Sequence, residues 1–288
     1  MFLQLVISGL TVGGVYALLG VCIAMIFKAT DVVNFAQGEF AMVGAYLCYC
    51  FYVGFGMSYF AAVCATLLGA AVIGFLMERL VFRPLIRFSV FVAIVSTIAV
   101  GIIFKNAARI IWGGDPLTLP SIFSMTPIRM GKIILVPQNL GVIFIAVGAI
   151  IALSLFFKYT RFGTAMRATQ QNRQVATLMG ISVKRVFSVT WVASFVLGAG
   201  AGVLFAPLVG MTPEMGSIGL KGFAAAVVGG FTSMPGSILG GFTLGIAENV
   251  AAAYLGAWSK DITAFFILIL ILTVKPTGLL ERAVKKKV

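Results

Sequence analysis

Long apolar stretches are the feature that most constrains how this chain folds. They recur along its 288 residues, at about 2–27, 40–55, 59–77, 90–111, 140–157, 187–209, 223–231, 238–257 and 262–274. Hydrophobic residues make up 61% of the chain and charged residues only 10%. Soluble domains contain about 45–50% apolar and 25% charged residues, and one of this size still exposes about a quarter of its unfolded-chain surface. The sequence therefore predicts an all-α polytopic membrane protein and excludes a soluble enzyme.

The lengths of these stretches predict about 8–9 transmembrane helices, because a helix needs about 17–25 residues to cross the bilayer. The stretch at 223–231 is too short to cross alone, and the one at 40–55 is marginal. The first stretch is expected to be a retained span, since no basic residue precedes it as in a secretory signal. We expect a single transmembrane domain over residues 1–288.

Basic residues predict which loops are cytoplasmic. The chain has 21 Lys and Arg against 8 Asp and Glu, a net charge of +13. In a membrane protein such an excess gathers in cytoplasmic loops, which explains the charge better than nucleic-acid binding does. The basic clusters are segments 79–87, 158–186 and 275–287. We therefore expect these three inside, and the N-terminus and the segments 112–133 and 210–222 outside.

This topology requires a broken element late in the chain. If 210–222 lies outside and the tail inside, the segment 223–275 must cross an odd number of times. It offers either a re-entrant hairpin plus one span, or three crossings with two short helices. In both cases we expect the backbone around Gly229, Gly230 and 235–236 to break inside the membrane, where protein or a water-filled cavity must shelter it.

The sequence contains few residues that could carry out catalysis. It contains no histidine, and its four cysteines lie in apolar stretches, where they are expected to be small hydrophobic residues. No phosphate-binding loop, metal-spaced ligand cluster or nucleophile elbow is present. A membrane-bound enzyme is therefore disfavoured, and we expect no catalytic, cofactor-binding or metal-binding residues. Transport is the function class that remains.

Polar residues at membrane depth are the first candidates for a transport role. An isolated carboxylate such as Glu248 costs at least about 2.5–3.5 kcal/mol at a helix centre. We expect Glu248 to face the bundle interior or a partner subunit, either in the transport path or as a structural partner of a backbone group or an arginine. Asn34, Gln37 and Glu39 precede the second span, either as path residues or as a polar turn with Glu39 near a helix N-terminus.

Glycines form a second group of candidates in the late apolar region, namely Gly229, Gly230, Gly240 and Gly241. Small residues let helix backbones approach closely in lipid. Close packing is the favoured interpretation for most glycines of this chain. For these four, the functional alternative is that they line the path of an apolar solute, where their small size lets the wall of the path move.

The basic segment 158–186 contains an amphipathic stretch. Its pattern predicts a short helix over residues 167–180, capped at its C-terminus by Gly180. The residues that share its apolar face are Ala168, Val175, Leu178 and Met179. Such a helix either lies on the lipid surface or docks into a groove of another protein.

Several motifs together resemble one transporter family. Gln174-Val175-Ala176 with Gly180 resembles the degenerate Glu-Ala-Ala-x-x-x-Gly signature of ABC importer permeases, without its later Ile-x-Leu-Pro part. Specific matches to branched-chain amino acid permeases of the LivH type are 33–39 with 44–46, 78–85, 222–230 through 235–236, 240–241 and Glu248, and 276–280. The resemblance covers nearly the whole chain. It departs at Gln37, where the family often has His, and in a short outer loop.

The resemblance implies a permease subunit of an ATP-driven importer for branched-chain or other hydrophobic amino acids, or related amides, in a bacterial or archaeal inner membrane. A fold like that of type II ABC importers is expected. The implied partners are a second homologous permease, two cytoplasmic ATPases that bind ATP-Mg, an extracytoplasmic binding protein and the bilayer, but no nucleic acid. The alternative is a secondary transporter or channel for a small polar solute working alone. Against it stand the lack of intramembrane ion pairs and the docking-like helix over 167–180.

The resemblance also assigns roles to the candidate residues. ATPase coupling is expected to involve Arg167, Arg173, Gln174, Ala176 and Gly180, with Ala176 inside the ATPase groove and the arginines against acidic rim residues. The translocation path or the permease interface is expected to involve Asn34, Gln37, Glu39, Gly229, Gly230, Gly240, Gly241 and Glu248.

Overall fold

The computed structural model describes residues 2–85, 88–124, 126–130 and 133–280. Within these ranges the α-helices are α1 (Phe2–Thr30), α2 (Gln37–Tyr49), α3 (Tyr59–Met77), α4 (Arg83–Leu85), α5 (Val90–Trp112), α6 (Pro137–Tyr159), α7 (Arg161–Gln171), α8 (Arg173–Leu178), α9 (Val183–Val209), α10 (Ile218–Gly229), α11 (Met234–Leu255) and α12 (Ser259–Val274). Two π-helical turns, Cys50–Gly54 and Glu78–Phe82, extend α2 and α3, and a 3-10 helix, Pro213–Ser217, precedes α10. The strands β1 (Ile128–Met130) and β2 (Ile133–Leu135) form an antiparallel hairpin.

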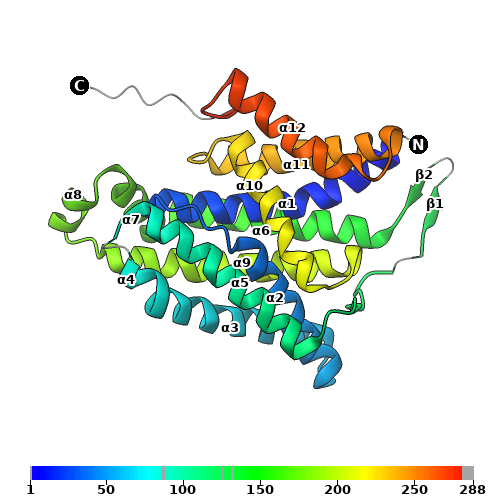
Figure 1. Cartoon of the computed structure of the whole chain (residues 1–288), viewed down its shortest axis with the longest axis horizontal. Coiled ribbons are helices and arrows are strands. Elements are labelled where there is room, and N and C mark those ends of the chain that lie inside the picture. The colour runs from blue at the N-terminus through cyan, green and yellow to red at the C-terminus, as the bar shows by residue number, and fades with distance from the viewer. Residues whose placement is uncertain (1, 86–87, 125, 131–132, 281–288) are drawn as a thin grey trace.

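Helix α1 is the central element of the bundle. Its residues are apolar around the whole circumference, which is typical of a helix buried on all sides. It packs against α6, α9, α10 and α11, and 83% of its most apolar window is buried. Figure 1 shows α1 in blue, running lengthwise through the bundle with the other long helices around it.

Every apolar stretch of the sequence lies on a helix, so the all-helical prediction is confirmed for the membrane region. Within the part of the chain that the structure describes, six helices are long and apolar enough to cross a bilayer, namely α1, α3 continued through Leu85, α5, α6, α9 and α11. Three are shorter, because α2 has 13 residues, α10 has 12 and α12 has 16. The structure thus establishes a multi-pass chain with six candidate spans, and the count of 8–9 stays a prediction.

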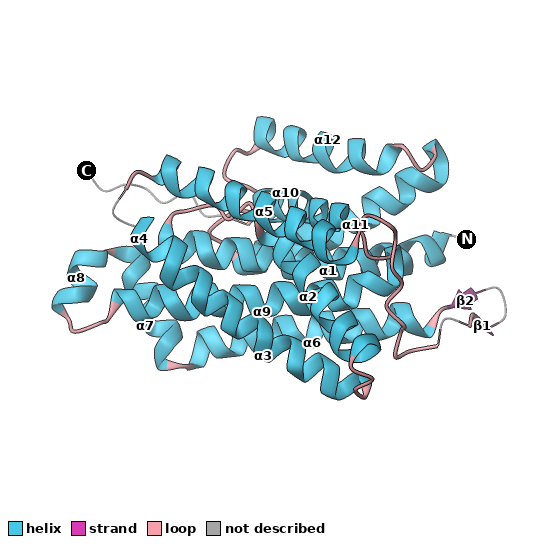
Figure 2. Cartoon of the chain, turned by 60° about the horizontal axis from the view of Figure 1, so that its bottom comes forward, coloured by secondary structure: helices cyan, strands magenta, loops and turns pink. Residues whose placement is uncertain are grey.

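The basic segments gather at one end of the bundle. Figures 1 and 2 show α4, α7 and α8 at one end, and the N-terminus and the β-hairpin at the opposite end. The predicted cytoplasmic segments 79–83 and 158–185 therefore lie together, apart from the predicted outer loop. Arg87 and the basic residues 282–287 fall outside the described residues.

The predicted break near residue 230 is a turn between two helices, and it lies at an end of the bundle and not inside it as expected. Helix α10 ends at Gly229 and α11 begins at Met234, so α10, α11 and α12 follow one another. The choice between the re-entrant and the three-crossing option stays a prediction, because of these three only α11 is a candidate span among the described residues. The turn lies at the end of the bundle with the basic segments, because the rings of Phe27 and Phe231 are 5.0 Å apart. The amide of Leu279 donates to the Val228 carbonyl at 2.9 Å, so the C-terminal segment covers the end of α10.

A different irregular segment penetrates the bundle. Helix α2 begins at Gln37, beside Ser194 in the middle of α9, so the non-helical residues 32–36 reach that depth before the helix starts. Backbone groups in this segment that make no helical hydrogen bond are paired with side chains, as the membrane interior requires. The Phe35 amide donates to Thr97 Oγ1 and the Ala36 amide to Asn34 Oδ1, both at 3.1 Å. The sequence marked this stretch as marginal for a span, but it did not predict that the helix begins inside the bundle.

Candidate functional site

Glu248 on α11 is the centre of a buried ion-pair network. Its side chain is almost fully buried, and its Oε2 accepts hydrogen bonds from the Tyr16 hydroxyl at 2.8 Å and from Lys221 Nζ at 3.1 Å. Lys221 Nζ also lies 2.9 Å from Oδ1 of Asp261. Glu248 Oε1 has no partner among the described residues. The expectation that Glu248 faces the bundle interior agrees with this placement, and its charged partner is a lysine.

Lys221 corrects two points of the sequence interpretation. The charge pattern placed it in an outer loop, but it lies on α10, with a side chain that is only 18% exposed. The lack of intramembrane ion pairs counted against a transporter working alone, and the Lys221–Glu248 pair removes that objection. Charge counting missed the pair because it lies 27 residues apart in sequence and on two different helices.

The four candidate glycines of the late apolar region serve close helix packing. A Cβ on Gly241 would lie 2.3 Å from the Ala17 amide nitrogen of α1, and one on Gly240 would lie 2.2 Å from the Ala225 carbonyl oxygen of α10. A Cβ on Gly229 would lie 2.0 Å from the Gly236 carbonyl carbon, and Gly230 ends α10 at a φ of +105°. None of the four lines the cavities described below. Their packing brings α1, α10 and α11 together and so assembles the network around Glu248.

Asn34 and Gln37 form a second buried network, at the start of α2. Asn34 Nδ2 donates to Gln37 Oε1 at 3.1 Å, and Gln37 Nε2 donates to the Ser194 carbonyl at 3.2 Å. The Ser194 hydroxyl donates back to Gln37 Oε1 at 2.9 Å. Both side chains are fully buried, so these contacts hold the start of α2 against α9. The glutamine at the position where the family often has His is thus a link between helices.

Glu39 lies apart from Asn34 and Gln37. It lines a cavity of about 310 Å³ together with Phe35, Lys105 and Ser217, between α2, α5 and the start of α10. The structure therefore brings two of the three polar candidates together and separates the third. Glu39 shares this cavity with Lys105, a basic side chain that the sequence did not associate with it.

A charged cluster joins α5 to the 3-10 helix at the hairpin end of the bundle. Arg109 donates to Glu214 Oε1, and Lys105 Nζ lies 3.6 Å from the same oxygen. Desolvation acts to raise the pKa of the Glu214 carboxyl, but a backbone hydrogen bond and the charges of Lys105 and Arg109 outweigh it and lower the pKa. The sequence analysis did not single out this cluster. The four-residue spacing of Lys105 and Arg109, which places both on one helix face, is the signal that could have indicated it.

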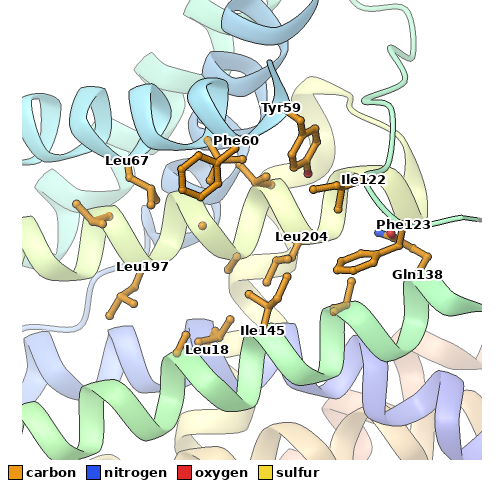
Figure 3. Close-up of a pocket in the computed structure, with 17 residues that line it drawn as sticks. Leu18, Tyr59, Phe60, Leu67, Ile122, Phe123, Gln138, Ile145, Leu197 and Leu204 are labelled. Carbon is orange, nitrogen blue, oxygen red and sulfur yellow. The ribbon is translucent and has the colours of Figure 1, made fainter. Parts of the chain in front are cut away.

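An apolar groove occupies a different side of the bundle (Figure 3). It has a volume of about 340 Å³, and side chains such as Phe60, Ile145 and Leu204 from α3, α6 and α9 point into it. Its polar member Gln138 is buried and already accepts a hydrogen bond from the Ser121 hydroxyl. The outward faces of α3 and α6 are apolar, so this groove belongs to the lipid-facing side.

The predicted helix over 167–180 is instead two helices. Helix α7 ends at Gln171, and the Asn172 side chain accepts hydrogen bonds from the amides of Gln174 and Val175, at 2.9 and 3.1 Å, to cap α8. Asparagine is a preferred N-cap residue, which explains why a new helix begins there. Gly180 follows α8 with a φ of +82° and open space around its α-carbon, as expected for a C-terminal cap.

The coupling candidates in this segment have divided roles. Arg167 donates to the Phe157 carbonyl at 2.6 Å, and Arg173 pairs with Asp31 and lies over the ring of Phe187. Ala176 is buried in its own chain, and Gln174 is exposed. The exposed apolar tip of α8 consists of Val175, Leu178 and Met179, which are 53%, 86% and 77% exposed. The tip, and not Ala176, is thus the surface available to a partner.

The fold and these networks define a multi-pass membrane protein. Residues 5–274 match the family model described as branched-chain amino acid transport system permease component, and the chain belongs to this family. It is 35% identical to the high-affinity branched-chain amino acid permease LivH of Salmonella typhimurium, over 100% of this chain and 98% of that protein. It is 32% identical to BraD of Pseudomonas aeruginosa, with the same two coverages. The family resemblance expected from the sequence is thereby confirmed.

A solved structure shows the same fold. PsaBC from Streptococcus pneumoniae, determined in complex with a Fab, matches with a TM-score of 0.50 at 16% identity. The match covers 96% of this chain and 93% of that chain. At this identity the likeness concerns the fold alone.

Proposed function

We propose that this chain is the permease subunit of an ATP-driven importer in the inner membrane. Its cargo is a branched-chain or other hydrophobic amino acid, or a related amide. The full-length similarity to LivH and BraD supports the cargo class. ATP-Mg is bound and hydrolysed by two separate cytoplasmic ATPases, and this chain contributes no cofactor site of its own.

The exposed tip of α8 is the observation that carries the coupling proposal. Val175, Leu178 and Met179 form an apolar surface at the basic end of the bundle, where a soluble partner can reach it. An apolar helix tip is suited to a groove on another protein. The contacts of Arg173 with Asp31 and Phe187 hold α8 against the bundle, so that a push on the tip moves α9.

Charged residues on α5 support a second permease beside this one. The side chains of Lys105 and Glu214 are 39% and 54% exposed, on a face that also includes Arg109. Charged groups facing acyl chains are costly, so this face is suited to a protein neighbour or a wet path. We propose that a homologous permease covers it, and that an extracytoplasmic binding protein delivers the cargo at this end.

The coupling proposal is tested by transport and ATPase assays on the complete reconstituted complex. Leu178→Asp is expected to lower cargo transport and cargo-stimulated ATP hydrolysis together, at least tenfold. Gln170→Asp, on a neighbouring exposed surface of α7, is the matched control and is expected to stay near the wild-type level. A disulfide between Met179→Cys and a cysteine in the ATPase groove would place the tip there. Full coupling in Leu178→Asp would refute the proposal.

A transporter working alone is the second candidate, and the buried Lys221–Glu248 pair favours it. Such a protein would move its solute down or against a gradient without any ATPase. The purified chain reconstituted by itself in vesicles discriminates the two. Uptake in the absence of ATPases would favour this second candidate, and uptake only with the full complex would favour the importer.

A further inference from the structure

A second cavity opens at the hairpin end of the bundle, apart from the apolar groove of Figure 3. It has a volume of about 310 Å³ and lies between the end of α9, the 3-10 helix, and the helices α10 and α12. Part of its wall is apolar, with Phe205, Met215 and Ile218. Another part is charged, with Lys221, Asp261 and Glu214, and the last is paired with Lys105 and Arg109 of α5. Pockets for small molecules begin at about 300 Å³, so this cavity suits one molecule of amino-acid size.

Lys221 and Asp261 of the cavity wall form a chain of three charged groups with Glu248 behind it. Lys221 Nζ lies 3.1 Å from Glu248 Oε2 on one side and 2.9 Å from Asp261 Oδ1 on the other. Glu248 is almost fully buried behind the wall, whereas the Asp261 side chain is 77% exposed. One lysine therefore serves two carboxylates. The Lys221–Asp261 contact can open at little cost, since Lys221 keeps Glu248 and Asp261 keeps water.

We infer that the head group of an α-amino acid binds between Lys221 and Asp261. Its carboxylate takes the place of Asp261 on Lys221, and its ammonium takes the place of Lys221 on Asp261. The exchange leaves the net charge of the site unchanged, because a zwitterion replaces one ion pair by two. The aliphatic side chain of the ligand lies against Phe205, Met215 and Ile218. This inference rests on the proposed function and adds a cargo-recognition site to it.

A purely structural role of Asp261 makes different predictions. If Asp261 only balanced the charge of Lys221, its loss would lower the stability of the protein and leave the choice of ligand unchanged. If Asp261 binds the ammonium group, its loss weakens the binding of zwitterions and leaves the binding of ligands without an ammonium group unchanged. Affinity and selectivity therefore separate the two roles.

The test measures direct binding of radiolabelled leucine to the purified permease–ATPase complex without the binding protein. Asp261→Asn is expected to raise the dissociation constant at least tenfold, and Asp261→Glu to restore most of the affinity. Lys260→Gln, the neighbouring exposed residue, is the matched control and should leave the affinity unchanged. Gel filtration and thermal unfolding of each variant show whether the complex is intact.

Competing ligands complete the test. In the wild-type complex we expect leucine to compete, and both leucinamide, which lacks the carboxylate, and 4-methylpentanoate, which lacks the ammonium group, to compete poorly. In Asp261→Asn the disadvantage of 4-methylpentanoate relative to leucine should shrink. Unchanged leucine affinity in an intact Asp261→Asn complex, or no binding to the wild type at millimolar leucine, would overturn the inference. If the complete wild-type system shows no ATP-driven leucine uptake, the proposed function itself is refuted.

Discussion

The buried network around Glu248 leads to an asymmetric prediction about stability. Removal of Lys221 should destabilise the fold more than removal of Glu248. After Glu248→Ala, Lys221 still has Asp261 at 2.9 Å and can turn toward the cavity. After Lys221→Met, Glu248 keeps only the Tyr16 hydroxyl, and its Oε1 already lacks a partner. A buried carboxylate without a counter-charge is the costlier outcome.

The magnitudes follow from the number of contacts that each change removes. Glu248→Ala removes two hydrogen bonds that involve charged groups, each contributing about 1.5–3 kcal/mol, and the contact of Lys221 with Asp261 brings the expected loss to the low end, about 3 kcal/mol. Lys221→Met leaves the charge of Glu248 unpaired, and breaking a buried pair in this way costs about 3–5 kcal/mol. In the double variant Glu248→Ala with Lys221→Met, the two losses should not add, because the charges disappear together.

Reversible unfolding of the purified chain in mixed micelles, followed by circular dichroism during titration with sodium dodecyl sulfate, measures these free energies. Asp261→Asn serves as the control, since its side chain is 77% exposed and its loss should change stability by less than about 1 kcal/mol. Equal or larger destabilisation by Glu248→Ala than by Lys221→Met would show that the asymmetry is absent. A coupling energy below about 0.5 kcal/mol in the double-variant cycle would show that the pair is not formed.

Three further predictions concern packing, pH and topology. Gly241→Leu should destabilise the fold by more than about 3 kcal/mol, because its Cβ alone would lie 2.3 Å from the Ala17 nitrogen. Gly148→Leu is the control and should be tolerated, since Gly148 has open space around it. Thermal unfolding in detergent compares the two variants. The contribution of Glu214 to stability should be complete above the ordinary pKa of a glutamate and be lost as pH falls through its lowered pKa, and Glu214→Gln should remove that pH dependence from an unfolding titration. A cysteine at the exposed Ser182 should react with an impermeant thiol reagent only from the cytoplasmic side, and labelling of intact cells would contradict the proposed orientation.

Some features of the site were visible in the sequence because they depend on local chemistry. The burial of Glu248 follows from the cost of a carboxylate facing lipid, wherever its partner lies. The cap at Gly180 follows from the φ of +82° that glycine adopts easily. The break at Asn172 was also readable, since asparagine is a preferred N-cap, but the apolar periodicity on both sides of it favoured one continuous helix.

Other features depend on residues that are distant in the chain. Tyr16 and Glu248 are 232 residues apart, and Gln37 and Ser194 are 157 residues apart. Nothing in the local pattern around any of these residues indicates its partner. The local pattern around Lys221 does not indicate its partner either, because a single lysine says nothing about a carboxylate on another helix. Charge counting therefore placed Lys221 in a loop. Close contacts of glycine backbones set these distances, and they exist only once the helices are assembled.

The sequence by itself determined that this chain is a bundle of apolar helices with its basic segments at one end, because length, hydropathy and charge act residue by residue. The tertiary structure alone decided that α2 begins halfway through the bundle, that Lys221 is the counter-charge of Glu248, and that Leu178 and Met179 point outward while Ala176 does not. The physical reason is that a buried polar group is stable only in contact with its partner, and the approach of helices distant in sequence determines which partner is within reach.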